Sequence, residues 1–312
     1  MERPQRGARA QRRAQERLER RPHRAGAREG HALRPAHRAV ARATLLTNEY
    51  PAEARAHFAN ASPRLDAIRA PTLLVQGMSD TLFPLNEAMR TYAALDAAGV
   101  DVRLHTHLGG HVAPYAQPLG TSAARRTPSA ESGPCGSTED AVVAWMREKL
   151  QGGPPSGIPR ASFALEDGRC VARDGPAGAT REATAALALA PAGAGSTLVP
   201  LAEGPLVVAG VPTLRAQVDA TAPGGVVFAS LVVVGADGFT RVVNDQSMPL
   251  RALPGAALAS ELAGVATALG PGERLLLRLD GLNEWYLHNG ARAPGAALLR
   301  DVVVALPVLD EA

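Results

Sequence analysis

The spacing of apolar residues changes near residue 160, and the two sides of that point predict different kinds of fold. Residues 71–77 form a short apolar run between Pro and Gly, which is typical of a buried parallel strand. Residues 84–98 carry apolar side chains at helical spacing, and residues 100–107 alternate as a second strand. This order predicts a β-α-β unit with a right-handed crossover.

A second helix is expected over residues 138–150, with Trp145 and Met146 on its buried stripe. Beyond a Gly/Pro-rich linker, short β-rich runs recur between turns, and Asp237-Gly238 has the composition of a hairpin turn. This part of the chain therefore predicts an antiparallel sandwich. Its expected strands are residues 162–165, 206–208, 213–220, 226–234, 240–244, 274–279 and 301–306.

These patterns divide the chain into three parts and give an α/β plus all-β fold class. We expect a disordered Arg-rich tail at residues 1–40, part of an α/β domain at residues 41–151 and a β-sandwich domain at residues 152–312. Hydrophobic residues make up 46% and charged residues 20% of the chain, a balance typical of globular proteins. No apolar run approaches the roughly 20 residues that cross a bilayer, so we expect no membrane partner.

The net charge of +3 conceals a strong asymmetry. Residues 1–40 hold 12 Arg and 4 Glu, a charge of +8, whereas the rest of the chain has 21 basic and 26 acidic residues, a charge of −5. Clustered Arg can neutralise nucleic-acid phosphates, but this segment has no aromatic residue to stack on bases, and we expect no nucleic-acid partner. A disordered tail, a shifted reading frame or a misplaced start explains the segment better.

Two features indicate a cellular location. The N-terminus lacks the apolar centre of a signal peptide, so we expect a cytoplasmic protein. Cys135 and Cys170 show no metal-binding spacing, and we expect both to be unpaired thiols in a reducing compartment.

Asp80 and His111 are the pair that could carry chemistry. Asp80 lies just past the strand at 71–77, and His111 follows the next strand. The loops at the carboxyl ends of parallel strands form the active crevice of an open α/β sheet, so both side chains could meet there. A carboxylate that orients an imidazole base is two-thirds of a Ser-His-Asp triad, and the acid-before-histidine order fits an α/β-hydrolase. The alternative makes Asp80 a turn residue and His111 a loop histidine.

The nucleophile of such a triad is missing from the sequence. The chain contains no Gly-x-Ser-x-Gly, the motif of the strained turn that presents the serine. Ser79, in Gly-Met-Ser-Asp-Thr, comes nearest, but the second glycine is absent and the presumed acid is its neighbour. The remaining candidates lie in loop sequence without a preceding strand: Ser122, Ser129, Ser132, Ser137 and Cys135.

Two further clusters have alternative interpretations. His105, His107 and His111 could bind zinc, but no carboxylate is grouped with them, and half-exposed strand residues are the simpler interpretation. We expect no metal and no cofactor. The cluster of Trp285, Tyr286 and His288 could be a substrate platform, although a loop anchor packed on the core is favoured.

The segment from Ile68 to Ala88, followed by Gly-Gly-His111, resembles the serine hydrolases that include Xaa-Pro dipeptidyl-peptidases and cocaine esterase-like acyl hydrolases. The segments at 206–212, 246–251 and 304–307 are similar to the C-terminal domain of that family. The resemblance covers residues 41–312 and implies a partial α/β-hydrolase sheet followed by a jelly-roll, galactose-binding-like sandwich. It also implies that Asp80 is the triad acid and His111 the triad base.

The resemblance implies hydrolysis of a peptide or ester substrate in the full-length family. Because the front strands and the nucleophile of that family are not found in this sequence, we expect a truncated hydrolase that is inactive alone. Complementation by a separately encoded front half is one alternative. A non-catalytic binding module, in which the sandwich acts on a hydrolase remnant, is another.

Overall fold

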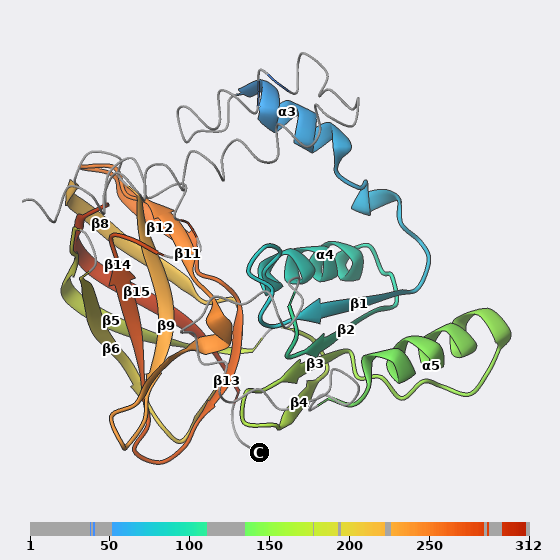
Figure 1. The fold of residues 1–312 in the computed structure, drawn as a ribbon. Helices are drawn as coiled ribbons and strands as arrows, with labels where there is room; N and C mark the ends of the chain where they lie inside the picture. The colour runs from blue at the N-terminus through green and yellow to red at the C-terminus, as the bar shows by residue number, and fades with distance from the viewer. Residues whose placement is uncertain are drawn as a thin grey trace, which may run out of the picture. The chain divides into compact units, whose positions relative to one another are not determined.

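The computed structural model describes residues 38, 40, 52–110, 135–176, 178–192, 195–221, 226–283, 286 and 295–309. The chain forms two compact units, residues 1–64 and residues 65–312. The first contains helix α3 (Ala52–Ala61), and the second contains the sheets (Figure 1). Within the described residues, no helix combines the length and apolar character needed to cross a membrane.

The predicted β-α-β unit is confirmed. Strand β1 (Thr72–Gly77) pairs in parallel with β2 (Val102–His107), and helix α4 (Leu85–Ala97) connects them. Two more strands extend the same sheet in the order β1-β2-β3-β4: β3 (Ala161–Ala164) is parallel to β2, and β4 (Cys170–Arg173) is antiparallel to β3.

The placement of β3 corrects one expectation. The strand predicted at residues 162–165 forms, but it pairs with β2 instead of joining the sandwich. All four residues of β3 are buried, so the strand is covered on both faces. A short strand of this kind is typical of the interior of an α/β sheet and shows no alternation that would reveal its partner.

Helix α5 (Thr138–Gln151) has well-defined ends. The Ser137 hydroxyl accepts a hydrogen bond from the Asp140 amide at 3.2 Å, and Gly152 ends the helix in the left-handed region with φ 64°. Trp145 is buried as predicted, and the Lys149 ammonium lies 4.5 Å above its ring centroid. Met146, which we expected on the same stripe, is 50% exposed.

The expectation of two free thiols is wrong. Cys135, just before α5, forms a disulfide with Cys170 at the start of β4. The two residues lie in different elements that sequence spacing does not bring together. The bond therefore fixes the N-terminal end of α5 to the edge of the sheet, and it is a feature typical of oxidising compartments.

Two antiparallel sheets form the sandwich (Figure 1). One sheet has the order β10-β9-β14-β6 with β11 beside β9, and the other has the order β12-β8-β15-β7-β13 with β5 beside β15. The hairpin at Asp237-Gly238 is confirmed, because β9 and β10 pair across it and Gly238 has φ 78°. The strands are β5 (Ala179–Ala190), β6 (Ser196–Glu203), β7 (Leu206–Gly210), β8 (Thr213–Thr221), β9 (Val226–Val234), β10 (Thr240–Val242), β11 (Met248–Arg251), β12 (Ala257–Glu261), β13 (Val265–Leu269), β14 (Arg274–Asp280) and β15 (Ala297–Leu309).

One hydrophobic cluster joins the α/β sheet to the sandwich. It contains Tyr92 of α4 and Phe163 of β3 together with Val207 and Ala266 of the sandwich, all buried. Asn86, only 2% exposed, adds polar contacts. Its amide nitrogen donates to the carbonyl of Leu262 at 2.9 Å and its oxygen accepts from the amide of Gly264 at 2.8 Å. The two parts of the second unit therefore share a core.

Phe163→Ala should test this shared core. The substitution removes a fully buried ring, so we expect the free energy of unfolding to fall by about 3–5 kcal/mol. Phe239→Ala, at a position that is 54% exposed, is the matched control and should cost less than about 0.5 kcal/mol. Urea unfolding measures both variants, and equal losses would contradict the shared core.

Candidate functional site

Asp80 lies in a tight loop at the carboxyl end of β1. One of its carboxylate oxygens, Oδ1, accepts hydrogen bonds from the amides of Leu82 and Phe83 at 3.0 and 2.9 Å. Gln76 supports the same loop, because its side-chain nitrogen donates to the carbonyl of Phe83 at 2.8 Å. Asp80 is 8% exposed. The loop therefore holds the carboxylate in one orientation at the edge of the sheet where parallel strands place active sites.

The loop after β2 lies directly against the loop that carries Asp80, residues 78–83, which we call the acid loop. The Ser79 amide donates to the carbonyl of Gly109 at 3.1 Å. A Cβ added to Gly77 would lie 2.3 Å from the oxygen of Gly109, and one added to Gly110 would lie 2.4 Å from the oxygen of Ser79. Only glycine allows the two backbones to approach this closely. His111, the next residue, lies outside the described residues.

Of the two strand histidines, His107 is half-buried as expected, whereas His105 is not. His105 is 3% exposed rather than half-exposed, and its Nδ1 lies 3.4 Å from the hydroxyl of Ser162. Burial, with a smaller contribution from His107, lowers the pKa of His105. The Nδ1 of His107 accepts a hydrogen bond from the Gly109 amide at 3.0 Å, which makes His107 part of the loop before His111. Burial lowers the pKa of His107, and the nearby Asp80 opposes that shift.

Within the part of the chain that the structure describes, no group of three or more His, Cys, Asp or Glu could hold a metal ion. The Nδ1 contacts of His105 and His107 give both imidazoles a partner inside the protein.

Several of the nucleophile candidates do not lie in the strained strand-to-helix turn that a triad serine needs. Ser79 follows β1, but α4 begins only at Leu85, so there is no direct strand-to-helix turn to present its hydroxyl. Ser137 caps α5, and Cys135 is in the disulfide. Ser122, Ser129 and Ser132 lie outside the described residues.

Gln246 is a site residue that the sequence did not single out as functional. It follows the 3₁₀ turn η3 (Val243–Asp245) of the sandwich. Its side-chain nitrogen donates to the carbonyls of Met78 at 3.0 Å and Asp80 at 3.1 Å, across 168 and 166 residues of sequence. No local pattern could reveal such a contact, because it depends on how the sandwich packs on the acid loop.

Tyr286 behaves as the loop anchor that we expected. Its ring stacks on Phe228 with centroids 5.3 Å apart, and its hydroxyl donates to the carbonyl of Ser247 at 3.3 Å. Burial raises the pKa of its phenol. Trp285 and His288 lie outside the described residues.

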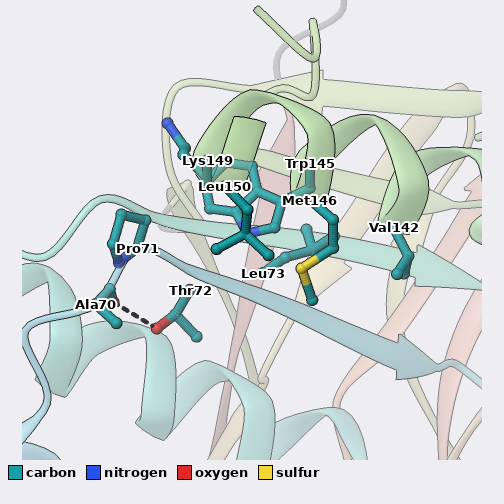
Figure 2. A pocket seen from close by; sticks show the side chains of 9 residues that line it. All are labelled: Ala70, Pro71, Thr72, Leu73, Val142, Trp145, Met146, Lys149 and Leu150. Carbon is teal, nitrogen blue, oxygen red and sulfur yellow. Dashed lines mark hydrogen bonds between the residues drawn. The ribbon is translucent and has the colours of Figure 1, made fainter. Parts of the chain in front are cut away.

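An apolar groove of about 450 Å³ lies at the other end of β1 (Figure 2). Active sites of parallel sheets lie at the carboxyl ends of the strands, whereas this groove lies where β1 begins, so it is separate from the acid loop. The groove is lined by Ala70, Pro71, Thr72, Leu73, Val142, Trp145, Met146, Lys149 and Leu150, which include no acid and no histidine.

Residues 2–113 match the sequence profile of the family described as X-Pro dipeptidyl-peptidase (S15 family). Over these residues the chain is similar to the X-Pro dipeptidyl-peptidase (S15) family. The match includes both Asp80 and His111, and it also includes the Arg-rich segment, which our resemblance left out. The disorder that we expect for that segment stays a prediction.

Solved structures confirm the α/β plus β-rich fold of this chain. An aminopeptidase from the marine sediment archaeon Thaumarchaeota archaeon has 14% identity and a TM-score of 0.50, with 77% of this chain and 55% of that chain covered. An α-amino acid ester hydrolase has 13% identity and a TM-score of 0.52, with 85% and 60% covered. A CocE/NonD family hydrolase from Staphylococcus aureus has 10% identity and a TM-score of 0.50, with 79% and 55% covered.

The chain therefore spans between 55% and 60% of the length of these three structures. No curated protein sequence matches it. The jelly-roll topology expected for the sandwich stays a prediction.

Gly110→Ala should disturb the contact between the two loops. An added Cβ would meet the backbone oxygen of Ser79 at 2.4 Å, so the loops must separate, and we expect a loss of about 1–3 kcal/mol in the free energy of unfolding. Gly175→Ala is the matched control, because a Cβ there meets no atom within 4 Å. Denaturant unfolding compares the two variants, and a Gly110→Ala protein as stable as the control would refute the close packing.

Proposed function

We propose that this chain carries the acid and the base of a serine hydrolase of the Xaa-Pro dipeptidyl-peptidase or acyl esterase type. Asp80 is the acid and His111 the base. The observation that supports this proposal is the contact of Gly109 and Gly110 with the Asp80 loop, which brings the residue before His111 against the acid. The family match over both residues and the fold of the hydrolases named above point to the same chemistry.

In the proposed reaction, His111 accepts the proton of a serine hydroxyl as that oxygen attacks the carbonyl carbon of a peptide or ester. Asp80 keeps the imidazole in the required tautomer and stabilises its protonated form. The imidazolium then protonates the leaving amine or alcohol, and water hydrolyses the acyl-enzyme by the same proton transfers in reverse. The substrate classes by which the similar aminopeptidase and α-amino acid ester hydrolase are named, peptides and amino acid esters, are both acyl compounds.

The serine belongs to sequence that this chain does not supply. None of its serines stands in Gly-x-Ser-x-Gly, and the chain spans at most 60% of the similar structures named above. We therefore propose that the 312-residue chain is a truncated hydrolase, inactive alone, and that a nucleophile-bearing segment completes it. Removal of a triad nucleophile lowers kcat by several orders of magnitude.

Asp80→Asn tests the acid–base pair without requiring activity. An opposite charge stabilises a protonated imidazole, so loss of the carboxylate should lower the pKa of His111 by about 1–3 units. Asp237→Asn is the matched control, because that carboxylate likewise accepts the amide two residues ahead, but in the sandwich hairpin. Histidine NMR titration, assigned with His111→Ala, measures the shift. Equal pKa values in both variants would show that Asp80 and His111 are not paired.

A fluorophosphonate probe tests the absence of a nucleophile. We expect no mass adduct on the intact chain, because none of its serines stands in the Gly-x-Ser-x-Gly motif of the activating turn. The S. aureus CocE/NonD hydrolase serves as the comparison protein in the same reaction. One stoichiometric adduct on this chain would contradict the proposal, and its position would identify the serine.

A further inference from the structure

We infer that Gln246 is a positioning residue that sets the geometry of Asp80 from the sandwich. This inference rests on the proposed function, because it assigns Gln246 a role toward the triad acid. Gln246 is 3% exposed, and one amide group donates to two carbonyls of the acid loop. Those carbonyls, of Met78 and Asp80, flank the turn that carries the carboxylate.

The two bonds constrain the loop at the place where orientation matters. The amide of Asp80 donates to the carbonyl of Gly77 at 3.3 Å, and its carboxylate accepts from Leu82 and Phe83, so the turn has contacts on both sides of Asp80. Gln246 binds the carbonyls of Met78 and Asp80 in this turn. A shift of those carbonyls would rotate the peptide planes next to Asp80 and so change the orientation of its carboxylate.

The segment that carries Gln246 is itself held in a strained conformation. Asn244 and Asp245 have φ values of 51° and 56°, in the left-handed region that non-glycine residues seldom adopt. Asn244 is fixed on two sides: its side-chain oxygen accepts from the amide of Ala266 at 2.7 Å, and its own amide donates to the carboxylate of Glu166 at 2.7 Å.

The other side of Gln246 is fixed as well. Asn283 donates from its side-chain nitrogen to the hydroxyl of Ser247 at 3.0 Å, and the hydroxyl of Tyr286 donates to the carbonyl of Ser247. Residue 247 is thus anchored to the sandwich, and residue 244 is anchored both to the sandwich and to the turn between β3 and β4. The amide of Gln246 is presented from a rigid support, which is how protein sites hold a working group in one geometry.

Hydrogen exchange of the Leu82 and Phe83 amides tests the inference, since both amides bind the Asp80 carboxylate. Gln246→Met keeps the length of the side chain and removes its donors. We expect both amides to exchange about tenfold faster, with the β2 amides unchanged. The matched control is Asn86→Leu, which removes another buried amide between the same two parts of the protein without touching the acid loop. Equal acceleration in both variants, or in neither, would overturn the inference.

A second variant covers the case in which Gln246→Met does not fold. In Gln246→Glu the carboxylate lacks a donor but the neutral acid has one, so the excess exchange over wild type should shrink as the pH falls. An excess that is independent of pH would also overturn the inference.

The pKa of His111 separates this inference from the proposed function. If both hold, Gln246→Met lowers that pKa in the same direction as Asp80→Asn, whereas Asn86→Leu leaves it unchanged. If Asp80→Asn has no effect on His111, the proposed function fails, while faster exchange in Gln246→Met alone would still establish the positioning of Asp80.

Discussion

The close approach of two loop backbones at the ends of β1 and β2 is the constraint on which the rest of the site depends. Gly77 and Gly110 leave no space for a Cβ, so the chain after β2 must run along the chain after β1. That contact holds the Gly109 carbonyl against the Ser79 amide, beside Asp80. The sandwich contacts the acid loop separately, through the side-chain amide of Gln246.

The acid loop therefore receives contacts from two parts of the fold that are distant in sequence. The α/β sheet supplies the backbone turn, the donor amides and the support from Gln76. The sandwich supplies one amide group from a strained segment. The sandwich is therefore more than a cover on the α/β sheet, because Gln246, which lies between β10 and β11, binds the backbone carbonyls of Met78 and Asp80.

The sequence predicted the parts whose signals are local. The strands around α4 and the position of Asp80 follow from apolar periodicity and from the rule that parallel strands place loops at one edge. Three features depend on long-range pairing, which no local signal encodes. The strand at 161–164 is buried on both faces and pairs with β2, in a sheet that we did not expect. Cys135 forms a disulfide with Cys170, and the side chain of Gln246 donates a hydrogen bond to the acid loop.

The shared hydrophobic cluster sets where this protein can be divided in the laboratory. A recombinant fragment that starts at residue 152, where the Gly/Pro linker suggests a boundary, would carry the β3-β4 pair without β2, the strand that joins it to the rest of its sheet. It would also expose Val207 and Ala266 to water. A fragment that ends there would lose Phe163 from its core. Neither piece would be a domain in the physical sense, since one compact unit extends from residue 65 through all three sheets and shares this cluster.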